Sequence, residues 1–248
     1  MSGCTEKEAE ELKLIHQQRV LPLQLKSSGI NQIFEMHITP DFGSGTGNQK
    51  YWNKPHGILH WMEESLGFGF NNNAASSNSH KDDDSIVIIL DPDMMLLRPI
   101  TSDFNSHTNY VGGWIDTKNT KQHQFKNTSP VNYNDDMVTH GHPHAQKYGF
   151  GNGWLTSLNG HLEDIVGPHS PALNISLQDA ADYYPAGPPY VATAKDMYQL
   201  AVHWVKFLPG VYKIFPQFMA EMHGYSIAAA HLKLPHKLAE GFMVSDGT

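Results

Sequence analysis

The chain has 248 residues, of which 40% are hydrophobic and 17% charged, and its formal net charge is −8. This length and composition allow one large α/β domain with an ample core and exclude the disordered class. The acidic balance, together with the lack of a basic patch, argues against nucleic acid as a partner. The single cysteine, Cys4, excludes an internal disulfide bond.

The first residues have neither a basic segment nor an apolar stretch, so we expect no targeting signal in this chain. No apolar run reaches the roughly 18 residues that a membrane span requires. We therefore expect no membrane span in these residues.

The N-terminal third is predicted to contain two helices and one strand. A capping box at Thr5–Glu8 predicts a polar helix that runs to about Arg19. Alternation over Gln32–Ile38 predicts a strand. The glycines of Gly43–Gly47 have the spacing of neither common phosphate-binding loop, which favours a surface loop.

A second helix is predicted from Asn53 to Gly67. Pro55 suits its first turn, and Gly67 is typical of a helix end. Its apolar stripe comprises Ile58, Trp61, Met62 and Leu66. After it, the polar residues of 71–84 predict a loop insertion without chemistry.

A short apolar run, Ser85–Leu90, is rich in β-branched residues and bounded by acidic residues on both sides. Such a run is too short for an independent helix and predicts a central strand buried on both faces. In open α/β sheets, ligands bind beyond the carboxyl ends of such strands.

Asp91, Pro92 and Asp93 follow this strand directly. Pro92 has no N–H to donate and favours an extended backbone at Asp91. Alternate side chains of an extended segment share one side, so both carboxylates are expected to aim at a common point. Such a pair forms a hard-oxygen site for Mn²⁺ or Mg²⁺ with positions left open for phosphate oxygens. A solvated turn at the strand end is the alternative.

The C-terminal half is predicted to contain one strand, a long irregular region and two helices. Tyr110–Ile115 is predicted as a strand, and residues 116–189 as loops with little regular structure. Thr193–Asp196 predicts the cap of a helix that Pro209 ends. Its apolar positions are Met197, Leu200, Ala201, Trp204 and Leu208.

A further helix is predicted to begin near Pro216. Its expected core positions are Phe218, Met219, Met222, Tyr225 and Ala229. Glu221 and His223 lie on the same helix and could face a cleft; a plain surface acid is the alternative for Glu221.

The histidines of the segment His140–His144 form a tract with the residue types of a zinc site. A zinc hydrolase built on this tract is one alternative function, although no H-E-x-x-H motif accompanies it. A loop histidine near the substrate, His142, is the interpretation we favour. His236 follows the last helix and is predicted to complete a metal shell begun by Asp91 and Asp93.

Several short segments in order along the chain resemble the peptidyl serine α-galactosyltransferases of plants and algae and, more distantly, the hydroxyproline O-arabinosyltransferases. The segments are Ser2–Glu6, Asn53–Pro55, Ile89–Met94, Arg98–Thr101, His140–Pro143, Gly187–Tyr190, Asp196–Tyr198, Ala220–Ser226, Leu234–His236 and Met243–Ser245.

The resemblance implies a GT-A-like nucleotide-diphospho-sugar transferase fold, α/β in class, with a mixed central sheet flanked by helices. It implies transfer of galactose or arabinose from a UDP-sugar to a hydroxyl of serine or hydroxyproline in a peptide, in the Golgi or endoplasmic reticulum lumen. In the family a strand that contacts the nucleotide base precedes Cys4–Glu6. We therefore expect one domain, residues 1–248, that lacks this first nucleotide-binding strand.

Roles follow for individual residues. Asp91 and Asp93 match the metal-binding DxD motif of the family. Asn53, Lys54 and Arg98 are expected to bind the donor phosphates. An ordinary surface position is the alternative for Lys54 and for Arg98. Tyr190 is expected to line the acceptor side. Glu221 is the expected catalytic residue, and it would orient the acceptor hydroxyl or stabilise an oxocarbenium-like centre. A truncated, non-catalytic binding protein is the other alternative function.

Overall fold

The computed structural model describes residues 5–22, 35–43, 49–69, 83–91, 94, 137–239 and 242. The chain forms two compact units, residues 1–76 and 77–248. The predicted strand Tyr110–Ile115, the segment 70–82 of the polar insertion and the glycines of residues 44–48 lie outside the described residues.

The first unit begins with the predicted capping box. Thr5 Oγ1 accepts a hydrogen bond from the Glu8 N–H at 3.3 Å, and the Glu8 carboxylate accepts one from the Thr5 N–H at 2.8 Å. Helix α1 (Glu6–Ile15) continues into a π-helix, η1 (His16–Val20), so the predicted helix to about Arg19 is confirmed. No residue of α1 is buried.

Helix α3 (Asn53–Glu64) follows a 3₁₀ turn, η2 (Gln49–Trp52), and confirms the second predicted helix. Ile58 and Met62 lie on its apolar face and are buried. Gly67 has a φ of +74°, which favours glycine, and its N–H donates to the Glu63 carbonyl at 3.1 Å as in a helix end. Leu66 lies beyond the helix and is exposed, so its predicted place in the apolar stripe was wrong.

The strand predicted at 32–38 does not form over residues 35–38, which have no regular structure. His37 is instead bound to α3 by side chains, with its Nε2 atom 2.9 Å from Nδ1 of His60. Phe42 is tied to the start of α3 through the Asn53 carbonyl oxygen, which accepts the Phe42 N–H at 2.7 Å. Polar side-chain contacts therefore hold this segment in place of a strand ladder.

The described residues of the second unit form a mixed, four-stranded sheet in the order β1-β3-β2-β4. Its strands are β1 (Ile86–Ile89), β2 (His144–Lys147), β3 (Ala186–Thr193) and β4 (Lys237–Ala239). β3 is antiparallel to β1 and β2, whereas β2 is parallel to β4. β1, β2 and β4 therefore point the same way, and we call the end at which they finish the carboxyl end of the sheet. The expected α/β class with helices on a mixed sheet is confirmed.

β1 forms where the apolar run predicted it, but it is not central. Among the described strands it lies at one end of the sheet, and Val87 is its only buried residue. The fully buried strand is β3, whose eight residues are all buried. The prediction that β1 is buried on both faces was wrong, because a β-branched run indicates a strand without fixing its place in the sheet.

β3 contains two prolines that argue against a central strand by sequence alone. Ala145 pairs with Tyr190, but Gln146 pairs with Gly187, so Pro188 and Pro189 fall inside an irregularity of the ladder. The missing N–H groups of the prolines therefore coincide with the place where the ladder is interrupted.

The region predicted to hold little regular structure is partly helical. It contains α4 (Gly153–Thr156), α5 (Leu162–Val166), the 3₁₀ turn η4 (Pro171–Asn174) and α6 (Leu177–Tyr183). Ser170 caps η4 and Ser176 caps α6 through their hydroxyl groups. These helices are too short to show a clear apolar period, and residues 116–136 lie outside the described part.

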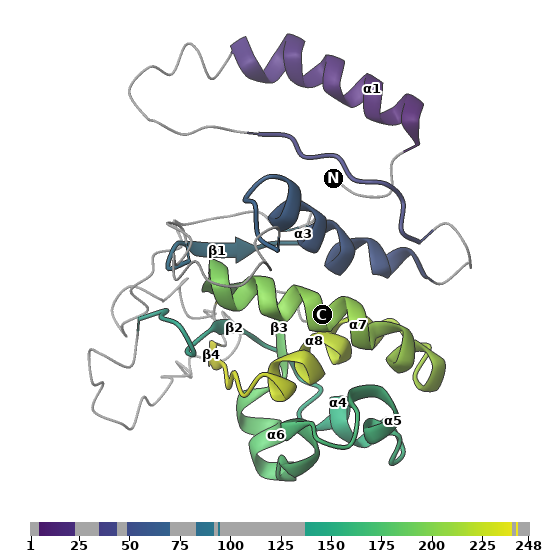
Figure 1. Cartoon of the computed structure of the whole chain (residues 1–248), viewed down its shortest axis with the longest axis vertical. Helices are drawn as coiled ribbons and strands as arrows, with labels where there is room; N and C mark the ends of the chain where they lie inside the picture. The colour runs from purple at the N-terminus through teal and green to yellow at the C-terminus, as the bar shows by residue number, and fades with distance from the viewer. Residues whose placement is uncertain are drawn as a thin grey trace, which may run out of the picture. The chain divides into compact units, whose positions relative to one another are not determined.

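Helices α7 (Ala194–Ile214) and α8 (Ala220–His231) lie side by side, with α4, α5 and α6 grouped beyond them (Figure 1). α7 runs through Pro209, so the predicted end there was wrong. Val211 and Tyr212 are buried one turn further on, which offsets the lost hydrogen bond of the proline. Every residue from Ala220 to Ala230 is buried, whereas Phe218, expected in the core, is 67% exposed.

Among the helices that the structure describes, none has the length and apolar character to cross a bilayer.

Three buried histidines of the second unit make its stability depend on pH. Burial lowers the pKa of His144 to about 4, of His223 to about 4 and of His236 to about 3. Histidine in the unfolded chain titrates near about 6.5, so below that pH the unfolded chain binds more protons than the folded one. The stability present above about pH 6.5 is therefore lost as the pH falls toward these folded-state values.

We expect a steep loss of folding free energy below about pH 6.5, with roughly three protons taken up on unfolding near pH 5 from these groups. Urea denaturation measured at a series of pH values checks this. A denaturation midpoint that stays constant between about pH 7 and pH 5 would contradict it.

Candidate functional site

Asp91 lies two residues beyond the end of β1, at the carboxyl end of the sheet, and is half-buried. Its carbonyl accepts the N–H of Met94 at 3.0 Å, so the chain turns immediately after the strand. Asp93 and Arg98 lie outside the described residues, and their predicted roles stay predictions. The structure thus places one of the two predicted carboxylates at the expected end of the strand.

Tyr190 is paired with Ile89 across the β1–β3 ladder and is fully buried. Its ring stacks on Tyr225 of α8 with a centroid distance of 3.9 Å and meets Trp204 of α7 edge to face at 5.7 Å. The ring is therefore clamped between the sheet and the two long helices. Among the described residues, the Tyr190 hydroxyl has no hydrogen-bond partner.

Two carboxylates act on this hydroxyl. Burial raises the pKa of Tyr190 well above its usual value. The charge of Glu221 raises it further, and Tyr225 and Asp91 follow with smaller effects. Both carboxylates therefore lie within electrostatic reach of the same buried hydroxyl. We call Asp91, Tyr190 and Glu221 the rim cluster. Each was predicted as a site residue from the sequence, and the predicted roles, including that of Tyr190 on the acceptor side, stay predictions.

Glu221 stands in the first turn of α8 and is 5% exposed, so the surface-acid alternative was wrong. The indole N–H of Trp204 donates to the Glu221 carbonyl at 2.8 Å, which fixes the start of α8 against α7. A negative side chain in the first turn also matches the positive end of the helix dipole. Helix packing thus sets the position of this carboxylate.

Tyr148 borders the rim cluster and was missed by sequence reasoning. Its N–H donates to the Pro185 carbonyl at 2.8 Å, and it also acts on the Tyr190 hydroxyl. Its ring lies against Gly187, where a Cβ atom would overlap the ring. The glycine at 187 is the one sequence signal that could have indicated this close approach.

The rim cluster offers carboxylate oxygens, which suit Mg²⁺ and Mn²⁺ better than softer metals. Within the described residues, no three His, Cys, Asp or Glu side chains are gathered as they would be around a metal ion. Asp91 therefore fits the predicted metal in donor type and position, and the predicted second donor, Asp93, is outside the described part.

His236 is placed differently from its predicted role. It precedes β4, three strands from β1 in the sheet order, and is fully buried. Its Nδ1 atom lies 3.0 Å from the Leu234 carbonyl and its Nε2 atom 2.8 Å from the Tyr225 hydroxyl. Because Nδ1 must donate to the carbonyl, Nε2 accepts from Tyr225. Metal binding by His236 stays a prediction that would require this hydrogen bond to break.

His142 precedes β2 and so lies at the opposite end of the sheet from Asp91. In the register of the sheet, His144 is level with Val191 and Ile88. His142, two residues earlier, is therefore about level with Ile86, and Asp91 is five residues further along the strand direction than Ile86. At about 3.3 Å per residue this is roughly 16 Å. The structure therefore does not bring His142 to the rim cluster, and its predicted contact with substrate stays a prediction.

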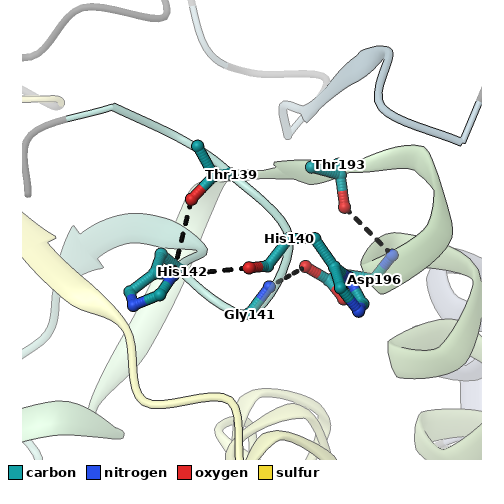
Figure 2. A network of polar contacts seen from close by, with 6 residues as sticks. All are labelled: Thr139, His140, Gly141, His142, Thr193 and Asp196. Atoms are coloured by element: carbon teal, nitrogen blue, oxygen red, sulfur yellow. Dashed lines mark hydrogen bonds and ion pairs between the residues drawn. The ribbon is translucent and has the colours of Figure 1, made fainter. Parts of the chain in front are cut away.

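A polar network ties the histidine tract to the start of α7 (Figure 2). The buried Asp196 carboxylate accepts the Gly141 N–H at 2.8 Å and lies 2.6 Å from His140 Nδ1. Asp196 also donates its own N–H to the Thr193 hydroxyl at 3.3 Å, as the predicted cap requires. Gly141 has a φ of +85°, which lets the chain turn over the carboxylate.

The three imidazoles of the tract lie in different environments. His140 is bound to Asp196, whereas His142 is exposed and its ring is turned away from that carboxylate (Figure 2). His144 is buried in the sheet. They are not gathered as ligands of one metal, so the described geometry gives no support to a zinc hydrolase built on this tract.

The remaining predicted residues, Asn53 and Lys54, belong to the first unit. Asn53 ties the start of α3 to Asp41 and Phe42: its side-chain carbonyl oxygen accepts from the Phe42 N–H, and its amide donates to Asp41 Oδ1 at 2.8 Å. Lys54 lies in the first turn of α3. Binding of the donor phosphates by these two residues stays a prediction.

Comparison of the chain with known protein families, with curated proteins and with solved structures finds no match.

Two substitutions in the Asp196 network test which contact holds the histidine tract against α7. We expect Asp196→Ala to lower the free energy of unfolding by about 1–3 kcal/mol, because the Gly141 N–H loses its acceptor. His140→Ala removes only the exposed partner of the same contact, and we expect it to cost less than about 1 kcal/mol. Urea denaturation at neutral pH compares the two variants, and equal losses would contradict this account of the network.

Proposed function

We propose that the chain is a metal-dependent glycosyltransferase that moves galactose or arabinose from a UDP-sugar to a hydroxyl of serine or hydroxyproline in a peptide. The observation that carries the proposal is the rim cluster, in which Asp91 at the end of β1 and Glu221 of α8 both act electrostatically on one buried hydroxyl. The resemblance of the chain to peptidyl serine and hydroxyproline glycosyltransferases supports the same reaction, a GT-A-like fold and a Golgi or endoplasmic reticulum setting.

Asp91, with Asp93 beside it in the sequence, supplies the donor set for Mn²⁺ or Mg²⁺. When bound, such a cation neutralises the negative charge that develops on the departing diphosphate. Asp91 stands where the chain turns after β1, and this fixes its backbone at the carboxyl end of the sheet. Ligands of α/β sheets bind at this end.

Glu221 is the residue we assign to the acceptor side. It is held on a buried helix whose start is fixed to α7, so its carboxylate has little freedom to move. A carboxylate so placed can accept a hydrogen bond from the acceptor hydroxyl or stabilise positive charge on the sugar ring. The Tyr190 hydroxyl is buried and unpartnered within the described residues, and it is a hydrogen-bond donor on which both carboxylates act electrostatically.

The proposal predicts metal-dependent binding of the nucleotide. We expect the chain to bind UDP in the presence of Mn²⁺ and to lose that affinity at least tenfold in Asp91→Asn, because the neutral amide is a poor ligand for a hard cation. Asp84→Asn is the matched control, since Asp84 is an exposed acid at the other end of the same strand. Isothermal titration calorimetry with and without Mn²⁺ measures both.

Glu221→Gln separates binding from turnover. We expect this variant to keep Mn²⁺-dependent UDP binding and to lose most UDP-sugar hydrolysis or transfer, because a neutral amide can neither stabilise developing positive charge nor accept a proton. UDP binding without any turnover in the unaltered chain would favour the non-catalytic alternative. The absence of metal-dependent UDP binding would contradict the proposed function.

A further inference from the structure

A pair of histidines in the first unit joins two segments that are distant in sequence. His37, in the segment 35–43, places Nε2 2.9 Å from Nδ1 of His60 on α3. The two ring centroids are 5.0 Å apart and the ring planes are tilted by 53°. Both side chains are half-buried, so solvent reaches the pair.

Two imidazole nitrogens at this distance must share one proton, because one of them donates and the other accepts. The other nitrogen of His37, Nδ1, lies 3.1 Å from the Ser65 hydroxyl. If that nitrogen carries a proton, the hydroxyl accepts it and Nε2 presents a lone pair toward His60. Ligand histidines in metal sites usually donate their second N–H to an oxygen in this way.

The spacing of the pair matches that of two adjacent ligands on one metal ion. Nitrogen ligands of zinc lie about 2.0–2.1 Å from the metal, so two of them at a right angle are about 2.9 Å apart. Tetrahedral geometry requires about 3.3 Å, which a small rotation of the rings supplies. A metal ion can take the place of the shared proton once each ring turns so that its nitrogen lone pair points at the ion instead of at the other nitrogen.

Charges of both signs act on the pair. Burial lowers the pKa of His37, His60 and the positive N-terminus of the chain lower it further, and the Glu64 carboxylate acts in the opposite direction. The neutral form of His37, the form that binds metal, is therefore favoured, and Glu64 brings negative charge within electrostatic reach. The Phe42 ring, 6.3 Å from the His60 ring, covers part of the pair with apolar surface.

We propose that His37 and His60 form a two-histidine site for a divalent transition metal ion of the zinc class, with water completing the coordination. Imidazole nitrogens suit Zn²⁺, Ni²⁺ and Cu²⁺, whereas the carboxylates of the rim cluster suit Mg²⁺ and Mn²⁺. The site is therefore chemically distinct from the proposed catalytic metal and does not depend on the proposed function. Its ion joins the segment 35–43 to α3 and stabilises the first unit by binding only the folded chain.

Zn²⁺ titration of the full chain, followed by calorimetry, tests the proposal. We expect a binding step that His37→Ala and His60→Ala each weaken at least tenfold, and that the double variant weakens no further than either single one, because chelation requires both ligands. His161→Ala is the control, since His161 is an exposed histidine bound to Asp164 in the other unit. A step of unchanged affinity and stoichiometry in both single variants overturns the proposal.

Two further variants keep the test valid if the alanine variants fold poorly. His60→Gln keeps a polar side chain on α3, and circular dichroism verifies its fold; we expect it to lose the same Zn²⁺ step. Ser65→Ala leaves both imidazoles in place and removes the hydroxyl partner of His37; we expect about 10–100-fold weaker binding. Full Zn²⁺ affinity in both of these variants overturns the proposal.

Discussion

The structure of the second unit depends on the burial of the Tyr190 ring between β3 and the two long helices. The ring stacks on Tyr225 and meets Trp204 edge to face, and all three side chains are inaccessible to solvent. Burial of a large apolar side chain contributes about 1.5–3 kcal/mol, and aromatic pairing of this kind adds about 0.5–1.5 kcal/mol. This contact joins β3, α7 and α8, and it thereby positions the hydroxyl on which Asp91 and Glu221 act electrostatically.

The sheet carries different side chains at its two ends. The carboxyl end holds the rim cluster, whereas the opposite end holds the Asp196 carboxylate with His140 and Gly141. Tyr225 connects the two ends, since its ring stacks on Tyr190 and its hydroxyl bonds to His236. The histidine tract thus helps to build the second unit.

Local signals in the sequence predicted local structure well. Thr5 and Thr193 cap the helices that their motifs predicted, and the β-branched run forms β1. Features that depend on distant partners could not be predicted in this way. β3 tolerates two prolines because its pairing with β2 is irregular there, and α7 passes Pro209 because buried residues follow it.

The same division applies to the candidate site. Asp91, Tyr190 and Glu221 were singled out separately, by a motif, a resemblance and a position on a helix. Only the packing of β1, β3 and α8 shows that they share one environment, and the role of Tyr148 appears only through its contact with Gly187.

The central claim is that the rim cluster borders a cation site. Paramagnetic line broadening by Mn²⁺, measured on tyrosine ring signals in the presence of UDP, tests it most directly. We predict that the Tyr190 signal broadens, while that of the exposed Tyr183 at the end of α6 does not. A Tyr190 signal that Mn²⁺ leaves unchanged would contradict the account.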